Sequence, residues 1–328
     1  QGFRDGPALQ ARFYEPLGLA VNNKGVVFVA DSYNHRIRRI GTDAMVTTFA
    51  GSGTAGLKDG KGTAAQLNKP TGLAFDDKGQ LYVCESGSST VRRLSPDGSI
   101  VTIAGGVLGF ADGKGKTAKL RRPLGLAWSP LGRLLVADNE NHAIRQVWPD
   151  GTVKTLARHA KGYAGTIDGK AGTGRLYYPN GVAVDAFGVA YFGESSRHVL
   201  RRVTPDGSVT TVAGKLSNPA NINGAGSAAR LYYTFGMASH PAGHLLVMEA
   251  FRMRRVTLQR HGCDDGKLCT TDTCNAATGK CGAAPPVCLG QGGACVTSAC
   301  DAKTGSCVIK NATDGAPCDD GDACTTEH

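Results

Sequence analysis

Long hydrophobic runs are absent from this chain of 328 residues. No apolar stretch approaches the roughly 20 residues that a membrane-spanning helix needs, so a helical membrane protein is not expected. Aromatic residues make up only 6% of the chain, whereas the hydrophobic fraction of 41% is enough for a globular core. The 46 glycines indicate many tight turns.

Cysteine is nearly absent from the first 260 residues, where Cys84 stands alone, while ten cysteines lie in the rest. Arginine is absent from His261 onward, where four Lys and nine acidic residues give a net charge of −5. Because the whole chain has a net charge of +10, residues 1–260 carry +15. These shifts coincide and predict two domains, 1–260 and 263–328. So many cysteines in a short segment indicate disulfides and an oxidising, extracellular compartment.

A sequence unit recurs five times, beginning at Pro16, Pro70, Pro123, Pro179 and Thr234 with spacings of 54, 53, 56 and 55 residues. Each copy has a Gly, an apolar strand, a turn, a second apolar strand ending in an acid, and a strand bearing Arg. A period of this length that is built from short strands indicates a propeller or a solenoid.

Four strands can be placed in the first unit, at Gly18–Val21, Val26–Ala30, Arg36–Ile40 and Val46–Ala50. Gly-containing turns and Pro-Asp-Gly turns join them, which favours antiparallel hairpins. Four antiparallel strands in a repeated unit are typical of a propeller blade. The predicted fold is therefore an all-β β-propeller with five visible blades, or six if residues upstream of Gln1 supply another, followed by small disulfide-rich modules.

An acid ends the second strand of every unit, and an Arg stands in every third strand. A catalytic pair is needed once, so a pair in every blade indicates a structural ion pair. The five predicted pairs are Asp31 with Arg38, Glu85 with Arg92, Asp138 with Arg145, Glu194 with Arg201, and Glu249 with Arg254.

The segments DSYNHRIRRI and DNENHAIRQV share an Asn-His-x-Ile-Arg core. With the strands that precede them, they resemble the NHL repeat, and the resemblance extends over residues 2–258. It implies a propeller, usually of six blades and most often used for binding, but no particular chemistry.

The residues just before the innermost strand differ between units, which repetition does not explain. We expect them to ring the mouth of the axial channel, where Tyr and Arg would contact a protein or a sugar. The predicted rim consists of Tyr14, Glu15, Lys69, Arg121, Arg122, Tyr177, Tyr178, Tyr232 and Tyr233. The alternative is that these residues vary freely on a solvated edge.

Catalytic and metal-binding candidates are few. His35, His142 and His198 occupy the same repeat position and are predicted to be structural. We find no convergent, unrepeated His/acid cluster, and therefore predict no catalytic residues, no metal and no cofactor. The basic charge of the first domain raises nucleic acid as a partner, but its Arg residues stand beside acids in the repeat, so no nucleic-acid partner is expected.

The last segment has a four-Cys pattern that repeats. Its cysteines are Cys263, Cys269, Cys274, Cys281, Cys288, Cys295, Cys300, Cys307, Cys318 and Cys324, the last two opening a third, truncated copy. CDDGKLCTTDTCNAATGKC resembles the CTDC repeat of slime-mould extracellular matrix proteins.

We predict that these ten cysteines form disulfides, with three pairings open in each module. The CxxC spacing of zinc knuckles is absent, and Asp264, Asp265 and Asp272 form no recognised calcium loop. Cys84 is expected to be a free buried thiol, and Asn311 begins a glycosylation sequon.

These observations predict a non-enzymatic structural or interaction part of a large secreted or cell-surface protein, acting in assembly or adhesion. The expected partners are other extracellular proteins, acidic polysaccharide or further copies of the protein; contact with a membrane is left open. Two alternatives remain: a metal-dependent propeller lyase or hydrolase with an axial site, and a carbohydrate- or protein-binding receptor head. Because the chain opens inside a repeat, we expect further sequence upstream.

Overall fold

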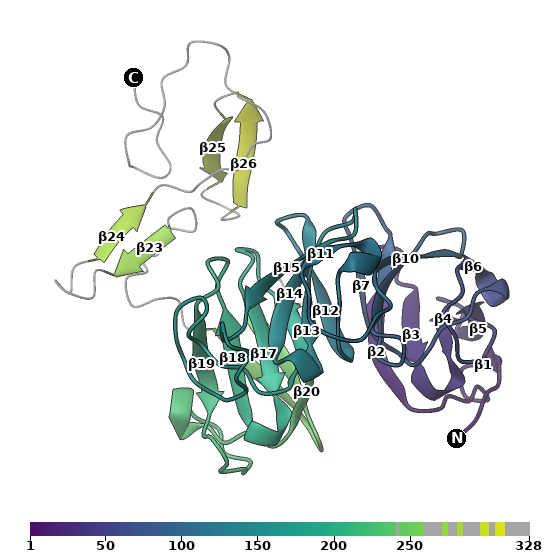
Figure 1. Ribbon diagram of the computed structural model, residues 1–328, viewed down its shortest axis with the longest axis horizontal. Helices are drawn as coiled ribbons and strands as arrows, with labels where there is room; N and C mark the ends of the chain where they lie inside the picture. Colours follow the sequence, from purple (N-terminus) through teal and green to yellow (C-terminus); the bar gives the residue numbers. More distant parts are fainter. Residues whose placement is uncertain (241–242, 259–270, 275–280, 285–295, 302–305, 312–328) are drawn as a thin grey trace. The chain divides into compact units, whose positions relative to one another are not determined.

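The computed structural model describes residues 1–240 and 243–258, together with short strands at 271–274, 281–284, 296–301 and 306–311. It divides into two compact units, Gln1–Thr257 and Leu258–His328. Figure 1 shows the first unit as a succession of small sheets that follow one another along the chain. Among the described residues, no helix has the length and apolarity needed to cross a membrane.

The first blade is an antiparallel sheet with the order β1-β5-β4-β3-β2. Its strands are β1 (Gly6–Pro7), β2 (Pro16–Val21), β3 (Val27–Asp31), β4 (Arg36–Ile40) and β5 (Met45–Ala50). The four predicted strands are present within two residues at each end. The sheet also contains a strand that was not predicted, because two residues of the connector pair with the outer strand, Gly6 opposite Val46.

The next blades repeat this arrangement and become shorter. Blade two has the order β6-β10-β9-β8-β7, blade three β11-β15-β14-β13-β12, blade four β16-β17-β18-β19 and blade five β20-β21-β22. The bounds in blade two are β6 (Gly60–Lys61), β7 (Pro70–Phe75), β8 (Leu81–Glu85), β9 (Thr90–Leu94) and β10 (Ser99–Gly105). Those in blade three are β11 (Gly113–Lys114), β12 (Pro123–Ser129), β13 (Arg133–Asp138), β14 (Ala143–Val147) and β15 (Thr152–Ala157).

The fourth blade consists of β16 (Pro179–Val184), β17 (Ala190–Glu194), β18 (Val199–Val203) and β19 (Val209–Gly214). The fifth consists of β20 (Thr234–His240), β21 (His244–Glu249) and β22 (Met253–Thr257), so within the described residues it has three strands, as its missing fourth strand in the sequence predicts. The all-β propeller with five blades is thus confirmed.

Short 3-10 helices occupy two recurring places. Three follow the acid that ends the second main strand: η1 (Ser32–Asn34), η4 (Asn139–Asn141) and η5 (Ser195–Arg197). The others lie in connectors: η2 (Gly62–Ala64), η3 (Gly115–Thr117) and η6 (Gly226–Ala228). In blades one, three and four, the 3-10 helix that follows the acid ends at a His with left-handed backbone conformation. These residues, His35, His142 and His198, contact the rim.

Apolar side chains from adjacent blades form the core. Between the first two blades, Phe28 and Ile37 of one blade are buried in the same cluster as Leu73 and Leu81 of the next. Equivalent clusters join blades two with three and three with four. Each blade is therefore stabilised mainly by its neighbours, as in other repeat architectures.

The end faces of the series of blades are exposed in the described structure. Leu19 of blade one is 67% exposed, whereas its repeat equivalent Leu73 is 7% exposed. On the opposite side, Met248 of blade five is 47% exposed, whereas the equivalent Ala137 is fully buried. Both end faces thus have the apolar character of a blade interface.

The second unit contributes two hairpins: β23 (Thr271–Cys274) with β24 (Cys281–Ala284), and β25 (Val296–Asp301) with β26 (Ser306–Asn311). The backbone register sets Cys274 opposite Cys281 and Cys300 opposite Cys307, the same place in both repeats. The side chains predicted to form disulfides and the Asn311 side chain lie outside the described part of the chain. So do Asp264, Asp265 and the side chain of Asp272, which were weighed as calcium ligands.

The repeated Gly of the innermost strand packs against the neighbouring blade. A Cβ on Gly72 would lie 2.6 Å from the carbonyl oxygen of Leu124, whereas a Cβ on Gly236 would meet nothing closer than the Met248 Cβ at 3.8 Å. Replacing Gly72 with Ala should lower the free energy of unfolding by about 1–3 kcal/mol, because two backbones must separate. Gly236→Ala is the matched control and should leave it unchanged or raise it by up to about 1 kcal/mol. Urea unfolding of both variants measures the difference, and equal effects would contradict the packing argument.

Candidate binding rim

The repeated acid and Arg lie together in every blade. The distance from Arg Nη1 to the carboxylate is 2.8 Å for Arg38–Asp31, 2.8 Å for Arg92–Glu85, 2.7 Å for Arg145–Asp138, 2.8 Å for Arg201–Glu194 and 3.3 Å for Arg254–Glu249. Both side chains are fully buried in the first four pairs. The sites predicted as ion pairs are therefore interior framework contacts.

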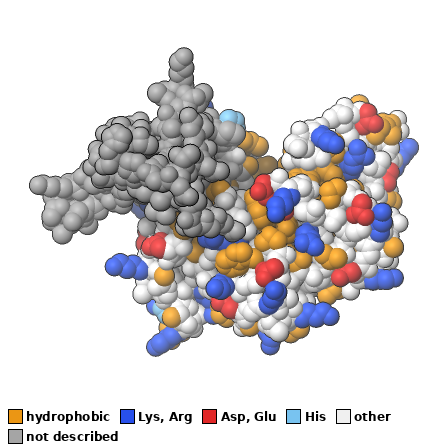
Figure 2. All heavy atoms as spheres, turned by 90° about the horizontal axis from the view of Figure 1, so that it is seen from above, with side chains coloured by type: hydrophobic (Ala, Val, Ile, Leu, Met, Phe, Trp, Pro, Cys, Tyr) orange, Lys and Arg blue, Asp and Glu red, His pale blue; other side chains and the backbone are white. Residues whose placement is uncertain are grey.

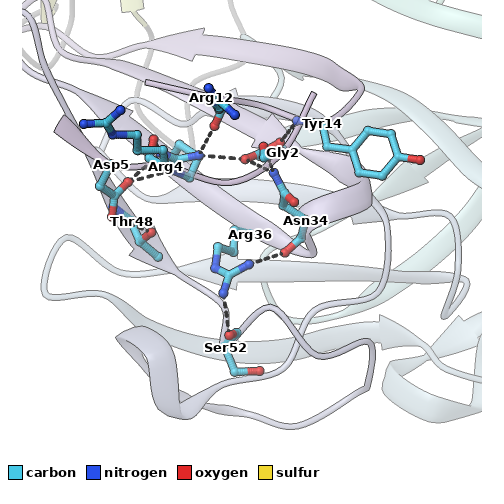
Figure 3. Close-up of polar contacts among 11 residues, drawn as sticks. Gly2, Arg4, Asp5, Arg12, Tyr14, Asn34, Arg36, Thr48 and Ser52 are labelled. Carbon is cyan, nitrogen blue, oxygen red and sulfur yellow. Dashed lines mark hydrogen bonds and ion pairs between the residues drawn. The ribbon is translucent and has the colours of Figure 1, made fainter. Parts of the chain in front are cut away.

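In blades one to four the Arg has a second acid, which comes from the connector. In blade one, Asp5 accepts hydrogen bonds from Arg38 and from the backbone and hydroxyl of Thr48 (Figure 3). The same triangle recurs in the next three blades, with Asp59, Asp112 and Asp168 in the place of Asp5. In blade five, Asn223 takes this position beside Arg254. The connector thus closes the edge of its own blade.

Burial acts against ionisation of the acids that end the second main strand of blades two, three and four. It raises the pKa of Glu85, of Asp138 and of Glu194, the last to about 7, although the paired Arg opposes each shift. The cost of desolvating two charges offsets much of their attraction. The pairs therefore specify how connector and strands meet more than they raise net stability.

In each blade the rim position consists of two consecutive residues, which we call a rim pair. The first residue of each pair is fixed through its backbone. The N–H groups of Tyr14, Arg121 and Tyr177 donate to the acid of their own blade, at 2.8, 2.7 and 3.1 Å. Asn68 and Tyr232 do the same toward Glu85 and Glu249. Figure 3 shows the Tyr14 ring pointing away from the polar cluster that its backbone joins.

The second residue of each pair has left-handed backbone geometry, with φ between 45° and 51° at Glu15, Lys69, Arg122, Tyr178 and Tyr233. In blades two to five, its N–H reaches the preceding blade. The Lys69, Tyr178 and Tyr233 amides donate to Nδ1 of His35, His142 and His198, each at 3.2 Å. The Arg122 amide donates to the Ser89 hydroxyl at 3.3 Å. These contacts join neighbouring blades at the rim.

An Nδ1 that accepts a hydrogen bond must be unprotonated. Burial is the main factor that lowers the pKa of His35, His142 and His198, and at the first two it is reinforced by nearby Lys or Arg. The three histidines therefore lie in the blade-to-blade contacts, and the rim backbone is held by two hydrogen bonds that do not depend on the rim side chains.

The rim side chains of blades four and five form two aromatic clusters, each of which packs on a His of the preceding blade. We call the two clusters together the aromatic rim; it comprises His142, Tyr177, Tyr178, His198, Tyr232 and Tyr233. His142 meets Tyr178 edge-on at 4.4 Å between centroids, and His198 meets Tyr233 at 4.7 Å. Tyr178 is 40% and Tyr233 38% exposed. These rings are partly packed and partly open to solvent.

Three residues that were not predicted extend this surface. The Arg197 guanidinium lies 4.0 Å from the centroid of the Tyr177 ring. Phe251, which is 82% exposed, stacks on Tyr232 at 5.8 Å, and Phe235 stacks on Tyr233 at 6.3 Å. The sequence feature that could have identified Phe251 is the break of the repeat pattern in the fifth unit.

The other predicted rim residues are more polar. Arg121 and Arg122 both contact Glu140, at 3.0 and 3.5 Å, so their charges are partly compensated. Lys69 lies 4.9 Å from the Tyr33 ring centroid, and Tyr14 packs on the same ring at 5.2 Å. Glu15 is exposed. The rim therefore divides into a polar part on blades one to three and an aromatic part on blades four and five.

Three further reactive side chains of the described residues lie away from the rim pairs. Cys84 is fully buried, and burial raises the pKa of its thiol well above the ordinary value. His240 and His244 stack at 4.3 Å beside the turn of blade five. Within the described residues, no three His, Cys, Asp or Glu side chains gather as a metal site would require.

The NHL repeat matches residues 13–40, 67–94 and 120–147. The chain therefore contains NHL repeats. A human NHL repeat-containing protein 2 is 30% identical over 65% of this chain and 34% of that protein. Human Teneurin-4 is 27% identical over 48% of this chain and 6% of its own length. The chain thus spans well under half the length of these relatives.

A solved structure with a similar fold is virginiamycin B lyase from Staphylococcus aureus. The TM-score is 0.51 at 13% identity, over 88% of this chain and 89% of that one. At this identity the likeness concerns the fold alone.

Breaking a buried pair should be costly. Arg145→Met leaves the carboxylate of Asp138 buried without its cation, so we expect the free energy of unfolding to fall by about 3–5 kcal/mol. Arg254→Met is the control, because its pair is longer and Arg254 is 9% exposed at its side chain. Urea unfolding should give a clearly smaller loss for Arg254→Met; equal losses would contradict the role assigned to the buried pair.

The histidine contacts predict a dependence of stability on pH. Because the folded state lowers the pKa of His142, the unfolded chain binds a proton that the folded chain does not, and stability falls as pH drops below about 6.5. His142→Ser copies the contact of Ser89 without a titrating group and should weaken this fall. Ser89→Ala should instead lower stability by a similar amount at every pH. Urea unfolding between about pH 5 and pH 7.5 tests both, and an unchanged pH slope in His142→Ser would refute the assignment.

Proposed function

We propose that the chain is a non-enzymatic interaction part of a secreted or cell-surface protein, and that it contributes to assembly or adhesion. The observation that carries the proposal is the division of the repeat positions. The repeated charged residues are buried in framework contacts, whereas the exposed rings of Tyr178 and Tyr233 stand where blades one to three have charged residues. A propeller that presents exposed aromatic side chains on a fixed backbone is suited to binding.

The aromatic rim has the composition of a protein-binding surface. Tyr and Arg are enriched among the residues that dominate binding energy, and they act best near the centre of a packed contact. Here Tyr178, Tyr233 and Phe251 are exposed, and ring-to-ring contacts restrict their rotamers before any partner binds. Arg197 lies over the neighbouring Tyr177 ring. Less side-chain entropy is then lost on association.

The charge of the first domain suggests an acidic partner. Residues 1–260 carry +15, and the net charge of the whole chain is +10. Figure 2 shows Lys and Arg scattered over the visible face among acidic side chains rather than gathered in one patch. This distribution favours long-range attraction to an acidic extracellular protein, or to acidic polysaccharide, over a dedicated charged cleft.

The proposed compartment rests on the cysteines. Ten of the eleven lie after residue 262, in repeats that resemble an extracellular matrix sequence. Disulfides persist in oxidising compartments, and small modules without a large core depend on them. In this proposal the propeller is the binding head and the cysteine-rich repeats form its support.

The test compares rim variants of the full chain in a binding assay. Tyr178→Asn and Tyr233→Asn remove the rings while Asn tolerates the left-handed backbone, so the fold should be kept. We expect retention of proteins from an extracellular-matrix extract on the immobilised chain to fall at least about tenfold for the double variant, a loss of about 1.4 kcal/mol. It should also weaken with added salt.

Glu15→Asn is the matched control, because it changes the same repeat position in blade one and should leave retention unchanged. Equal retention by the wild type and the double tyrosine variant would overturn the role of the rim. Retention of no protein by the wild-type chain would overturn the proposal of a protein-binding head.

A further inference from the structure

A groove lies between blades two and three, at the end of the sheets opposite to the rim. It has a volume of about 490 Å³, within the range of small-molecule sites. The turn between β7 and β8, the strands β8 and β9, the end of β12 and the β14–β15 turn all contribute to it. The residues that matter below are Asp76, Asp77, Lys78, Gln80, Arg93 and Trp128.

The groove adjoins a second, more open hollow of about 490 Å³, and Pro149 lines both. Trp148 lines the second hollow beside Lys154. The chain has only two tryptophans, and one lines each hollow. Two aromatic platforms that are separated by a proline suit an elongated ligand more than a compact one.

The Trp128 platform does not recur at the other blade interfaces. Its ring stacks on the buried Tyr82 at 5.8 Å with 12° between planes. The equivalent residue pairs are Phe28 with Phe75, Leu135 with Val184, and Tyr191 with Ser239. Framework positions repeat in this protein, so an unrepeated, partly buried Trp beside polar groups indicates a specific use.

The polar groups divide into one that is structural and several that remain available. Asp76 is occupied, since its carboxylate accepts from the Lys78 and Gln80 amides and from the Tyr82 hydroxyl. By contrast, the side chains of Asp77, Lys78 and Gln80 make no hydrogen bond to the described residues. Arg93 Nε is likewise buried without a partner among them, although the guanidinium also interacts with the Tyr82 hydroxyl.

The charges around the two hollows balance. Three carboxylates, of Asp76, Asp77 and Asp150, and three cations, of Lys78, Arg93 and Lys154, line the two hollows, and Asp150 is also paired with Lys114 at 2.9 Å. A charged ligand gains nothing from a neutral lining, whereas a polyhydroxylated ligand can both donate to carboxylates and accept from Lys, Arg and Gln. Its apolar ring faces would pack on the two indoles, as polar-edged rings do on aromatic side chains.

We propose that these two hollows form a binding site for a neutral oligosaccharide that runs from Trp128 to Trp148. The aromatic rings bind the apolar faces of sugar rings, and Asp77, Gln80 and Arg93 bind their hydroxyl groups. This site is distinct from the aromatic rim and does not depend on the protein contact proposed there.

Tryptophan fluorescence of the full chain tests the proposal directly, because both tryptophans lie in the site. Cellotetraose, chitotetraose and mannotetraose are the neutral probes, and tetragalacturonate is the charged one. We expect at least one neutral probe to shift or quench the emission at concentrations up to about 1 mM, a binding free energy near −4 kcal/mol. The same probe should bind at least about tenfold more weakly to Trp148→Ala and to Arg93→Gln, a loss of about 1.4 kcal/mol each.

Phe187→Ala is the matched control, since Phe187 is an exposed aromatic at the same turn of blade four as Lys78 in blade two. It should leave binding unchanged. Circular dichroism and urea unfolding show whether each variant keeps its fold, and Asp77→Asn gives a further exposed variant that should weaken binding without disturbing the core.

The proposal is overturned if no neutral probe changes the emission, or if tetragalacturonate binds more tightly than every neutral probe. It is also overturned if binding is equal in the wild type, Trp148→Ala and Asp77→Asn. An emission change caused by an unstructured peptide of mixed sequence, with none from the tetrasaccharides, would assign the groove to peptide binding instead.

Discussion

The buried Arg of each blade is the contact on which the rest of the propeller depends. In blade three, Arg145 reaches Asp138 at the end of one strand and Asp112 in the connector, and Asp112 in turn accepts from Thr155 on the outer strand. One guanidinium thereby fixes the edge of the sheet, its connector and its rim end. The planar geometry of Arg allows this divalent pairing, which a Lys could not reproduce. Stability gained from the charges themselves is small beside the geometry that they impose.

The acid that pairs with this Arg also fixes the backbone of the rim. Asp138 also accepts the Arg121 amide, and the next amide, of Arg122, is held by Ser89 of the preceding blade. The rim backbone is therefore fixed by groups other than its own side chains. Left-handed geometry at Tyr178 and Tyr233 is unusual for such residues, and it persists because hydrogen bonds from two blades specify it. The side chains at these positions can change without altering the frame.

Sequence periodicity predicted the blades, the strand order within them and the acid–Arg partners, because these features repeat and short strands have a clear pattern. It did not predict the two-residue edge strands, since Gly6–Pro7 has no strand signal and pairs only because the connector returns to its own blade. It also assigned His35 and His142 to structure without finding their partners. Their hydrogen bonds join residues 34 and 36 positions apart, and only the packing of neighbouring blades brings these groups together. Trp128 went unnoticed for the same reason, because its stacking partner Tyr82 lies in another blade.

The two candidate surfaces differ in how far their side chains are tied to the fold. At the rim, Tyr178 and Tyr233 are held through their backbone amides, so a Tyr ring can be exchanged at little cost in stability. In the groove, Trp128 packs on Tyr82 inside the interface between blades, and Asp76 holds both a turn and the Tyr82 hydroxyl. Binding and packing are therefore coupled there. A rim of this kind can adapt to changing protein partners, whereas a groove built from core contacts is better suited to one ligand of constant chemistry, such as a sugar.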